Sequence, residues 1–447
     1  MSRYKRYEKY KDSGVEWIGE IPEHWIHCKL GYLLVKNDSG TWGDDYDDDG
    51  VVVLRSTEIT LNGTWSIVDP ARRMIPVKEY ERCLLREGDL ILTKSSGSEQ
   101  HIGKTVIVDE DIAKMKCVFS NFMQRLRPEN GKLLPKYLYY FLNVNGREQL
   151  FYLSTTTTGL KNISGSTINA LKIQLPTMYE QVIIANFLDQ KTAEIDALIA
   201  DKEKLIELLQ EKRQAIITEA VTKGLDPNVK MKDSGIEWIG EIPEHWEILK
   251  VSWIFNIIGS GTTPFTSNID YYDGDIPWVN TGDLNDNYLY ETSKNITDLA
   301  VHECSALKFY PIDTLLIAMY GATIGKLAIT KIVVTTNQAC CALAHPKNGS
   351  TKFIFYWFLA NRDHIIAMAY GGGQPNISQN LIKSLRINMP GKHEQDSIVY
   401  YLDQKTAEID ALIADIDTQI QKLKEYRQSL ISEAVTGKID VRDYVID

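Results

Sequence analysis

The stretch KDSGVEWIGEIPEHW, residues 11–25, returns almost unchanged as KDSGIEWIGEIPEHW at residues 232–246. A second stretch, FLDQKTAEIDALIAD at 187–201, returns as YLDQKTAEIDALIAD at 401–415. Self-similarity of this kind is the sequence signature of a repeated architecture. We therefore expect two copies of one structural plan in the chain.

Two segments with little sequence in common lie between these near-copies. In both, short β-branched runs alternate with turn residues, which is typical of mixed α/β structure. The runs lie at 51–54, 90–93, 105–108, 314–317 and 327–334. We predict two modules of one fold with different surfaces. The predicted order is a frame at 1–25, a first module at 26–175, a central region at 176–246, a second module at 247–389 and a C-terminal region at 390–447.

Residues 180–222 and 394–436 are predicted to be long helices, because they are rich in helix-forming residues and contain no Gly or Pro. Apolar residues recur there at steps of three and four, the spacing of a coiled-coil seam, with polar interruptions such as Lys202 and Gln419. The predicted seam residues are Ile195, Leu198, Leu205, Leu209, Ile216, Ile409, Leu412, Ile416, Leu423 and Leu430.

Two such apolar stripes most simply bury each other, with two independent surface helices as the alternative. We predict an α+β protein in which two mixed α/β modules are joined by long antiparallel coiled-coil helices. The repeat would then be a circular, pseudo-two-fold one, with its break at the chain termini.

Composition sets broad limits on function. The 447 residues carry a formal net charge of −11, but overall charge bears on solubility and steering, so nucleic-acid binding stays possible. No apolar run approaches the roughly 20 residues of a membrane span, and the N-terminal residues lack a signal-peptide pattern. Six scattered cysteines without a CxxC pair favour reduced thiols and a cytoplasmic protein.

The sequence offers no catalytic constellation. GSEQHIGKT at 97–105 is close to a phosphate-binding loop, but five residues separate its glycines instead of four, and its counterpart GATIGK at 321–326 has three. We interpret both as turns before strands. Neither a methyltransferase tetrapeptide nor a nuclease carboxylate–lysine set occurs.

No metal site is predicted either. His24, His27 and Cys28 could suggest one, but the second frame keeps only His245. The acidic run Asp44, Asp45, Asp47, Asp48 and Asp49 is interpreted as a solvated loop, with a bound cation as the alternative. The frame tryptophans Trp17, Trp25, Trp238 and Trp246 are expected to pack in a core or to contact a protein partner.

Polar and basic residues on the loops between strands are the candidates for DNA contact. Arg and Gln can bond bidentately to base edges, whereas Lys more often neutralises phosphate. The candidates are Arg55, Ser56, Lys94, Ser96, Ser98, Gln100 and Lys104 in the first module, and Thr262, Thr263, Asn280, Thr281, Tyr320 and Lys326 in the second.

The repeated motifs resemble those of the specificity subunit of type I restriction-modification enzymes. The resemblance rests on KDSGxEWIGEIPEHW, on LDQKTAEIDALI and its helix, and on the NIS motif before a strand that ends at proline. It rests also on TTPF…DIPWVNTGDL and LLIAMYGATIGK in the second module. The first module departs from the pattern, since it has no TTP near its start and has LRSTEI where the second has VNTGDL.

The resemblance implies two target recognition domains, each reading one half of a bipartite, asymmetric site on double-stranded DNA. It implies that methyltransferase subunits, two of them, dock on the conserved regions and that motor-nuclease subunits join through the complex. The subunit itself would be non-catalytic, and S-adenosylmethionine, ATP and Mg would be bound by partner subunits. A coiled-coil adaptor for proteins and a self-sufficient modification enzyme are the alternatives.

Overall fold

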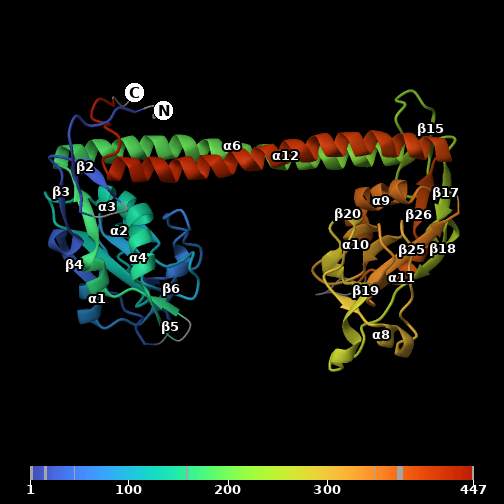
Figure 1. Ribbon diagram of the computed structural model, residues 1–447, viewed down its shortest axis with the longest axis horizontal. Helices are drawn as coiled ribbons and strands as arrows, with labels where there is room; N and C mark the ends of the chain where they lie inside the picture. The colour runs from blue at the N-terminus through green and yellow to red at the C-terminus, as the bar shows by residue number, and fades with distance from the viewer. Residues whose placement is uncertain are drawn as a thin grey trace. The chain divides into compact units, whose positions relative to one another are not determined.

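A computed structural model describes residues 4–14, 18–44, 46–157, 160–347, 349–369 and 376–444 of the chain (Figure 1). The chain forms two compact units. The first consists of Met1–Lys202 and Thr418–Asp447, and the second of Glu203–Asp417. Each unit therefore contains one of the two dissimilar segments and a half of each long helix.

The first unit is built on a four-stranded antiparallel sheet in the order β4-β11-β7-β9. A second sheet has the order β10-β5-β6, in which β5 runs parallel to β10 and antiparallel to β6. The strands of these sheets are β4 (Leu34–Ser39), β5 (Tyr46–Leu54), β6 (Ala71–Arg73), β7 (Leu90–Thr93), β9 (Thr105–Ile107), β10 (Val118–Phe119) and β11 (Met123–Pro128). All four residues of β7 are buried, so this LILT strand lies at the centre of the core.

Shorter elements complete the first unit. Its helices are α1 (Val77–Cys83), α2 (Glu110–Lys114), α3 (Pro135–Phe141), α4 (Arg147–Leu153) and α5 (Gly165–Ala170). Its remaining strands form a three-stranded sheet and two antiparallel pairs: β12 (Thr155–Thr157), β13 (Leu160–Asn162) and β8 (Ser95–Ser96); β1 (Tyr10–Asp12) with β2 (Glu20–Pro22); and β3 (Ile26–Lys29) with β14 (Lys172–Leu175).

The second unit repeats the two main sheets of this plan. Its larger sheet has the order β18-β25-β22-β23-β20, which adds one parallel edge strand, and its smaller sheet has the order β21-β19-β24. The strands are β18 (Phe255–Gly259), β19 (Tyr272–Val279), β20 (Asn287–Leu289), β21 (Asn295–Ile296), β22 (Leu315–Ala318), β23 (Leu327–Thr330), β24 (Thr335–Thr336) and β25 (Cys340–Pro346). The strands β19 and β24 are parallel, as are their counterparts β5 and β10, so the two modules share one fold.

The frame hairpin and a closing pair also recur in the second unit, as β15 (Met231–Asp233) with β16 (Glu241–Pro243) and β17 (Glu247–Lys250) with β26 (Arg386–Met389). Its helices are α7 (Val251–Ile254), α8 (Asp298–Glu303), α9 (Thr351–Ala360), α10 (Arg362–Ala367) and α11 (Gln379–Ser384). Seven consecutive residues of α9 are buried. A helix that is apolar all round belongs inside a core, and α9 contributes most of its residues to the main cluster of this unit.

The long helices are α6 (Met178–Lys223) and α12 (Lys392–Val435), of 46 and 44 residues. Their contacts run antiparallel within each unit. In the first unit Arg427 Nε lies 2.9 Å from Asp196 Oδ1, and in the second Arg213 Nε lies 3.0 Å from Asp410 Oδ1. These four residues are equivalent positions of the two copies, so the same ion pair forms once in each unit.

The predicted fold class is confirmed. Two α+β modules are joined by α6 and α12, which lie packed side by side (Figure 1). The N-terminal segment contacts the residues that follow the last helix. Tyr10 Oη donates to the Gly437 carbonyl at 3.1 Å, and Asp440 N–H donates to the Lys5 carbonyl at 2.8 Å.

The phase of the predicted seam is partly wrong. Leu198, Leu205 and Leu412 are exposed, with fractions of 44%, 44% and 53%. A heptad stripe that starts at Ile195 can continue at i+3 or at i+4, and the packing selects i+4. The positions that follow these alternating steps of four and three are all buried or half-buried: Ile195, Ile199, Lys202, Ile206, Leu209, Arg213, Ile216 and Ala220 in α6, and Ile409, Ile413, Ile416, Ile420, Leu423, Arg427, Leu430 and Ala434 in α12.

None of the helices in the described part of the chain combines the length and the apolar character that a membrane span requires.

Candidate nucleic-acid interface

Three of the predicted residues of the second unit gather around one loop, which follows β24. Thr263 Oγ1 donates to Gln338 Oε1 at 2.7 Å. Trp278 Nε1 donates to the Thr262 carbonyl at 3.1 Å, and Asn337 Nδ2 donates to Asn280 Oδ1 at 3.2 Å. The start of the module, the end of β19 and the loop after β24 therefore meet at one place.

Asn280 is turned inward at this place. It precedes the short helix η5 (Thr281–Asp283), and its backbone N–H donates to Asp283 Oδ2 at 2.8 Å. Its Nδ2 is buried and has no hydrogen-bond partner among the described residues. Thr281 is half-buried in the first position of η5. Asn280 thus anchors the loop rather than presenting its amide at the surface.

Tyr320 lies next to the loop after β24, and Lys326 lies at the end of the turn that follows Tyr320 in the chain. Met319 N–H donates to the Ala339 carbonyl at 2.8 Å, and Tyr320 forms an isolated bridge with Asn376. The turn that begins at Gly321 ends where the Lys326 carbonyl accepts from Ala318 N–H at 2.8 Å. The Lys326 side chain is half-buried.

In the first unit two of the predicted cations bind other groups of the same unit. Arg55 binds Glu58 through two N–H groups at 2.9 and 2.7 Å, in the position that Asn280 holds in the second unit. Lys104 is 2% exposed and donates to the carbonyls of Ser56 and Ile59. Burial lowers the pKa of the Lys104 amine. Lys104 has no surface from which to reach a duplex, so its prediction as a DNA contact is wrong.

The other predicted residues of the first unit lie on or near β8. Lys94 is half-buried, its Nζ donates to Ser39 Oγ at 2.5 Å, and burial lowers its pKa. Ser98 N–H donates to Ser96 Oγ at 3.1 Å. Gln100 is exposed, and its carbonyl accepts from Arg147. Lys94 is the member of this group that lies close to the loop after β10.

The loops after β10 and β24 carry two residues that the sequence did not single out. The register pairs Phe119 with Leu54 and Thr336 with Val279, which places Asn121 and Gln338 two residues beyond equivalent positions. Both side chains are exposed, although most residues around them are buried.

One sequence signal could have led to these loops. The tripeptide SGT occurs at 39–41 and again at 260–262, at the same distance from each WIGEIPEHW frame. A Cβ on Gly40 would lie 2.0 Å from the Phe119 carbonyl oxygen, and a Cβ on Gly261 would lie 1.7 Å from that of Thr336. Glycine is required where one backbone approaches another so closely. The SGT tripeptides therefore press against the ends of β10 and β24.

The phosphate-loop-like segments are turns, as predicted. Gly103 and Gly325 have φ values of +72° and +77°, and the strands β9 and β23 follow them. Within the described residues no group of three or more His, Cys, Asp or Glu could hold a metal ion. Asp45 and the side chains of Asp47 and Trp17 lie outside the described part of the chain.

Each frame places a histidine and a tryptophan against one glutamate of a long helix, and we call these two clusters the first and the second hub. His24 Nε2 and Trp25 Nε1 lie 2.8 and 3.3 Å from Glu180 Oε1 at the start of α6. His245 Nε2 lies 2.9 Å from Glu394 Oε2 at the start of α12, and Trp246 Nε1 lies 3.1 Å from Glu394 Oε1. Both tryptophans are fully buried, which supports the core interpretation for them.

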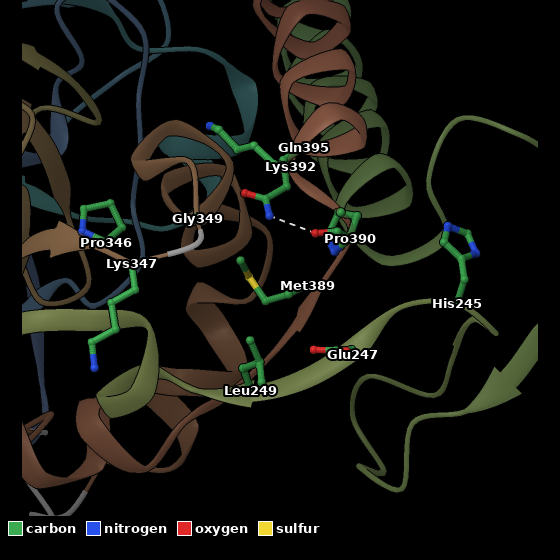
Figure 2. Close-up of a pocket in the computed structure, with 11 residues that line it drawn as sticks. His245, Glu247, Leu249, Pro346, Lys347, Gly349, Met389, Pro390, Lys392 and Gln395 are labelled. Carbon is green, nitrogen blue, oxygen red and sulfur yellow. Dashed lines mark hydrogen bonds between the residues drawn. The ribbon is translucent and has the colours of Figure 1, made fainter.

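A hollow of about 650 Å³ lies beside the second hub (Figure 2). His245, Glu247, Lys347 and Lys392 contribute polar groups to its lining. The Gln395 amide, in the wall of the hollow, is already hydrogen-bonded within the protein. It donates to the Pro390 carbonyl at 2.8 Å and accepts from Ser350 N–H at 2.7 Å. Gln395 thus stabilises the start of α12. Among the described residues the lining holds no cluster of three or more His, Cys, Asp or Glu that could bind a metal ion.

Comparisons with known proteins agree on one family. The model of the family "Type I restriction modification DNA specificity domain" matches residues 44–208 and 243–422. A putative type I restriction enzyme MjaX specificity subunit of Methanocaldococcus jannaschii is 25% identical over 95% of this chain and 96% of its own length. The EcoKI specificity subunit of Escherichia coli is 23% identical over 94% and 90%.

Solved structures show the same fold. A chain from a structure described as "Structural basis underlying complex assembly and conformational transition of the type I R-M system" aligns with a TM-score of 0.73, at 17% identity, over 94% of this chain and 99% of that one. The HsdS subunit of Thermoanaerobacter tengcongensis aligns with a TM-score of 0.53, also at 17% identity, over 94% and 98%. With two repeated modules, long paired helices and these matches, the chain belongs to the type I restriction-modification DNA specificity family, as a specificity subunit, the non-catalytic component of such a system.

Proposed function

We propose that each unit reads one half of a bipartite, asymmetric site on double-stranded DNA, while α6 and α12 set the gap between the halves. One observation carries this proposal. The two units share the strand order β4-β11-β7-β9 and β18-β25-β22-β23 in their larger sheets, yet they differ in the side chains that they place at equivalent positions. Asn121 corresponds to Gln338, and Arg55 corresponds to Asn280. A conserved scaffold with exchanged loop residues is what two readers of different sequences need.

The recognition segments are proposed to be 26–175 and 247–389, held between conserved regions at 1–25, 176–246 and 390–447. The DNA contacts would come from the loops around Thr263, Tyr320 and Lys326 in the second unit and around Lys94 and Gln100 in the first. Ser96, Ser98, Thr262 and Thr281 stay as neighbouring candidates. Lys104 is left out because it is buried.

The repeated regions are proposed to dock two methyltransferase subunits, and motor-nuclease subunits through the complex. An exposed aromatic residue supports the double docking, since it recurs at the same distance after each frame. Tyr32 is 73% exposed and Trp253 is 60% exposed. Aromatic residues are enriched at protein interfaces. S-adenosylmethionine, ATP and Mg would be bound by those partners.

We place this assembly in the cytoplasm. The support is that all six cysteines are unbridged, as is usual for proteins in reducing compartments.

The test is an exchange of one recognition segment. Residues 247–389 are replaced by the corresponding segment of a family member with a different target, and the hybrid is expressed with its methyltransferase subunit. Methylation-sensitive sequencing should then show a changed base sequence in one half of the site and an unchanged sequence in the other. A change in both halves, or no sequence-dependent methylation by the unaltered complex, would contradict the proposal.

A further inference from the structure

The loop after β24 exposes one side chain in a run that is otherwise buried. From Val334 to Cys340 every residue is buried except Gln338. In the first unit Asn121 is exposed after the buried strand β10 and is followed by Phe122, which is 51% exposed. Both units therefore present a carboxamide from the same position of the fold.

The backbone that carries Gln338 is fixed from several sides. The N–H groups of Ala339 and Cys340 donate to Asn337 Oδ1 at 3.0 and 3.1 Å, and Gly261 N–H donates to the Asn337 carbonyl at 3.3 Å. The Ala339 carbonyl is held by Met319 N–H. Because the loop is already held in one conformation, binding costs little conformational entropy. A single side chain on such a loop can therefore make a specific contact.

The loop that carries Asn121 is held in a corresponding way. Lys94 N–H donates to the Phe122 carbonyl at 3.0 Å, and Met123 N–H donates to the Ser120 carbonyl at 3.0 Å. Ser39 Oγ, which accepts from Lys94 Nζ, lies 3.4 Å from the Asn121 carbonyl. The SGT tripeptide thus supports the loop in both units.

The Gln338 amide keeps the groups that a base contact needs. Its Oε1 accepts one hydrogen bond from Thr263 and retains a second lone pair, because an amide oxygen has two. Its Nε2 has no bonding partner within the described residues. Asparagine and glutamine bind the N6 and N7 edge of adenine bidentately, with one donor and one acceptor. A carboxamide in this state fits adenine better than it fits any other base.

We propose that Gln338 and Asn121 are specificity-determining residues, each of which contacts one adenine in the half-site read by its own unit. This inference rests on the proposed function and adds to it the residues and the base. Thr263 is a positioning residue, which orients the Gln338 amide. Phe122 lies beside Asn121 and offers an apolar contact for the methyl group of a thymine.

The test measures base preference position by position. Complexes of the chain with its methyltransferase subunit are bound, at one fixed salt concentration, to duplexes in which each base pair of the site is varied in turn. Gln338→Ala should reduce discrimination roughly 5- to 100-fold at one A·T pair of one half-site only. Asn121→Ala should do the same at one A·T pair of the other half. Gln210→Ala, on an exposed position of α6, is the matched control and should change no preference.

Two further variants separate a reading role from a structural one. Gln338→Glu should shift the preference at the same position toward cytosine, whose N4 amine donates to a carboxylate. Thr263→Val should weaken discrimination at that position. Thr263→Ser keeps the hydroxyl and should discriminate as the unaltered protein does.

Three outcomes overturn the inference: unchanged preference at every position in Gln338→Ala, an equal loss of binding to all duplexes, or a change in both half-sites. In these cases the unaltered complex still discriminates between sequences, so the proposed function stands. An unaltered complex without any sequence preference would overturn the proposed function as well.

Discussion

Glu180 and Glu394 hold the same place in the two copies, where each binds a histidine and a buried tryptophan, but they differ in exposure. The Glu180 side chain is 4% exposed and that of Glu394 is 33% exposed. Replacing either glutamate leaves a buried indole N–H without its acceptor, which costs the desolvation of that group. Water can take the place of the acceptor more easily at Glu394, where the carboxylate is itself partly exposed. The same substitution should therefore have unequal effects in the two units.

We predict that Glu180→Ala lowers the free energy of unfolding by about 2–4 kcal/mol and that Glu394→Ala lowers it by about 1 kcal/mol. Urea unfolding of the purified variants, followed by tryptophan fluorescence, measures both values. Equal losses would show that exposure does not determine the strength of the two hubs.

The pH dependence of stability should also reflect the contacts of Glu180. Burial raises the pKa of the Glu180 carboxyl, but hydrogen bonds from His24 and Thr177 outweigh it and hold the pKa below its ordinary value. A carboxylate of this kind stabilises the fold above its unfolded pKa of about 4.3 and loses that contribution as the pH falls through the folded pKa. Between pH 5 and pH 3 the unaltered protein should lose stability more steeply than Glu180→Gln.

The surroundings of single side chains could not be predicted from the sequence. Lys104 follows a glycine in a turn and suggested a surface cation, but the carbonyls that bury it belong to Ser56 and Ile59, far away in the chain. Asn121 and Gln338 were missed because the segments around them share no sequence. Only the pairing of β10 with β5 and of β24 with β19 makes them equivalent.

At the scale of the elements, helices and strands were largely predictable. The helices expected at 180–222 and 394–436 are observed at Met178–Lys223 and Lys392–Val435. The apolar run predicted at 90–93 is the strand β7. Helix composition and short apolar runs are local signals, so one sequence is enough to read them.

The face that a helix buries is a tertiary property, and here the prediction failed in part. Leu198 and Ile199 are adjacent and both apolar, so spacing alone does not choose between them. The antiparallel partner does, since Ile199 is 8% exposed and Leu198 is 44% exposed. A polar contact, Lys202 Nζ to Gln419 Oε1 at 2.6 Å, lies within the observed seam.

We predict that Ile199→Ala lowers the free energy of unfolding by about 2–4 kcal/mol, because it removes buried methyl groups. Leu198→Ala, its matched neighbour, should change that free energy by no more than about 0.5 kcal/mol. Chemical denaturation of both variants gives the comparison. If Leu198→Ala lowered the free energy of unfolding more than Ile199→Ala does, Leu198 would be the seam residue, as predicted from the sequence.

At the scale of the whole molecule, the repeat made the architecture predictable. Two near-identical frames and two near-identical helices indicate two modules of one fold, and the strand orders of the two units agree with this. The base sequence that each unit reads was not predictable, because it depends on loop residues such as Asn121 and Gln338 that differ between the units.

We propose that the paired helices set the gap between two independently read half-sites. Each helix runs unbroken from one unit into the other, and their contacts pair Lys202 with Gln419 and Arg213 with Asp410. In this register a whole heptad can be added to both helices at facing points without disturbing the seam. Duplicating residues 198–204 in α6 and 411–417 in α12 adds about 10 Å to each helix.

The decisive measurement is methylation-sensitive sequencing of DNA modified by the complex that contains this doubly extended chain. We expect that both half-site sequences are kept and that the gap between them grows by about three base pairs, since base pairs rise about 3.4 Å each. An unchanged gap, with the extended protein folded and active, would contradict the claim that the helices set the spacing.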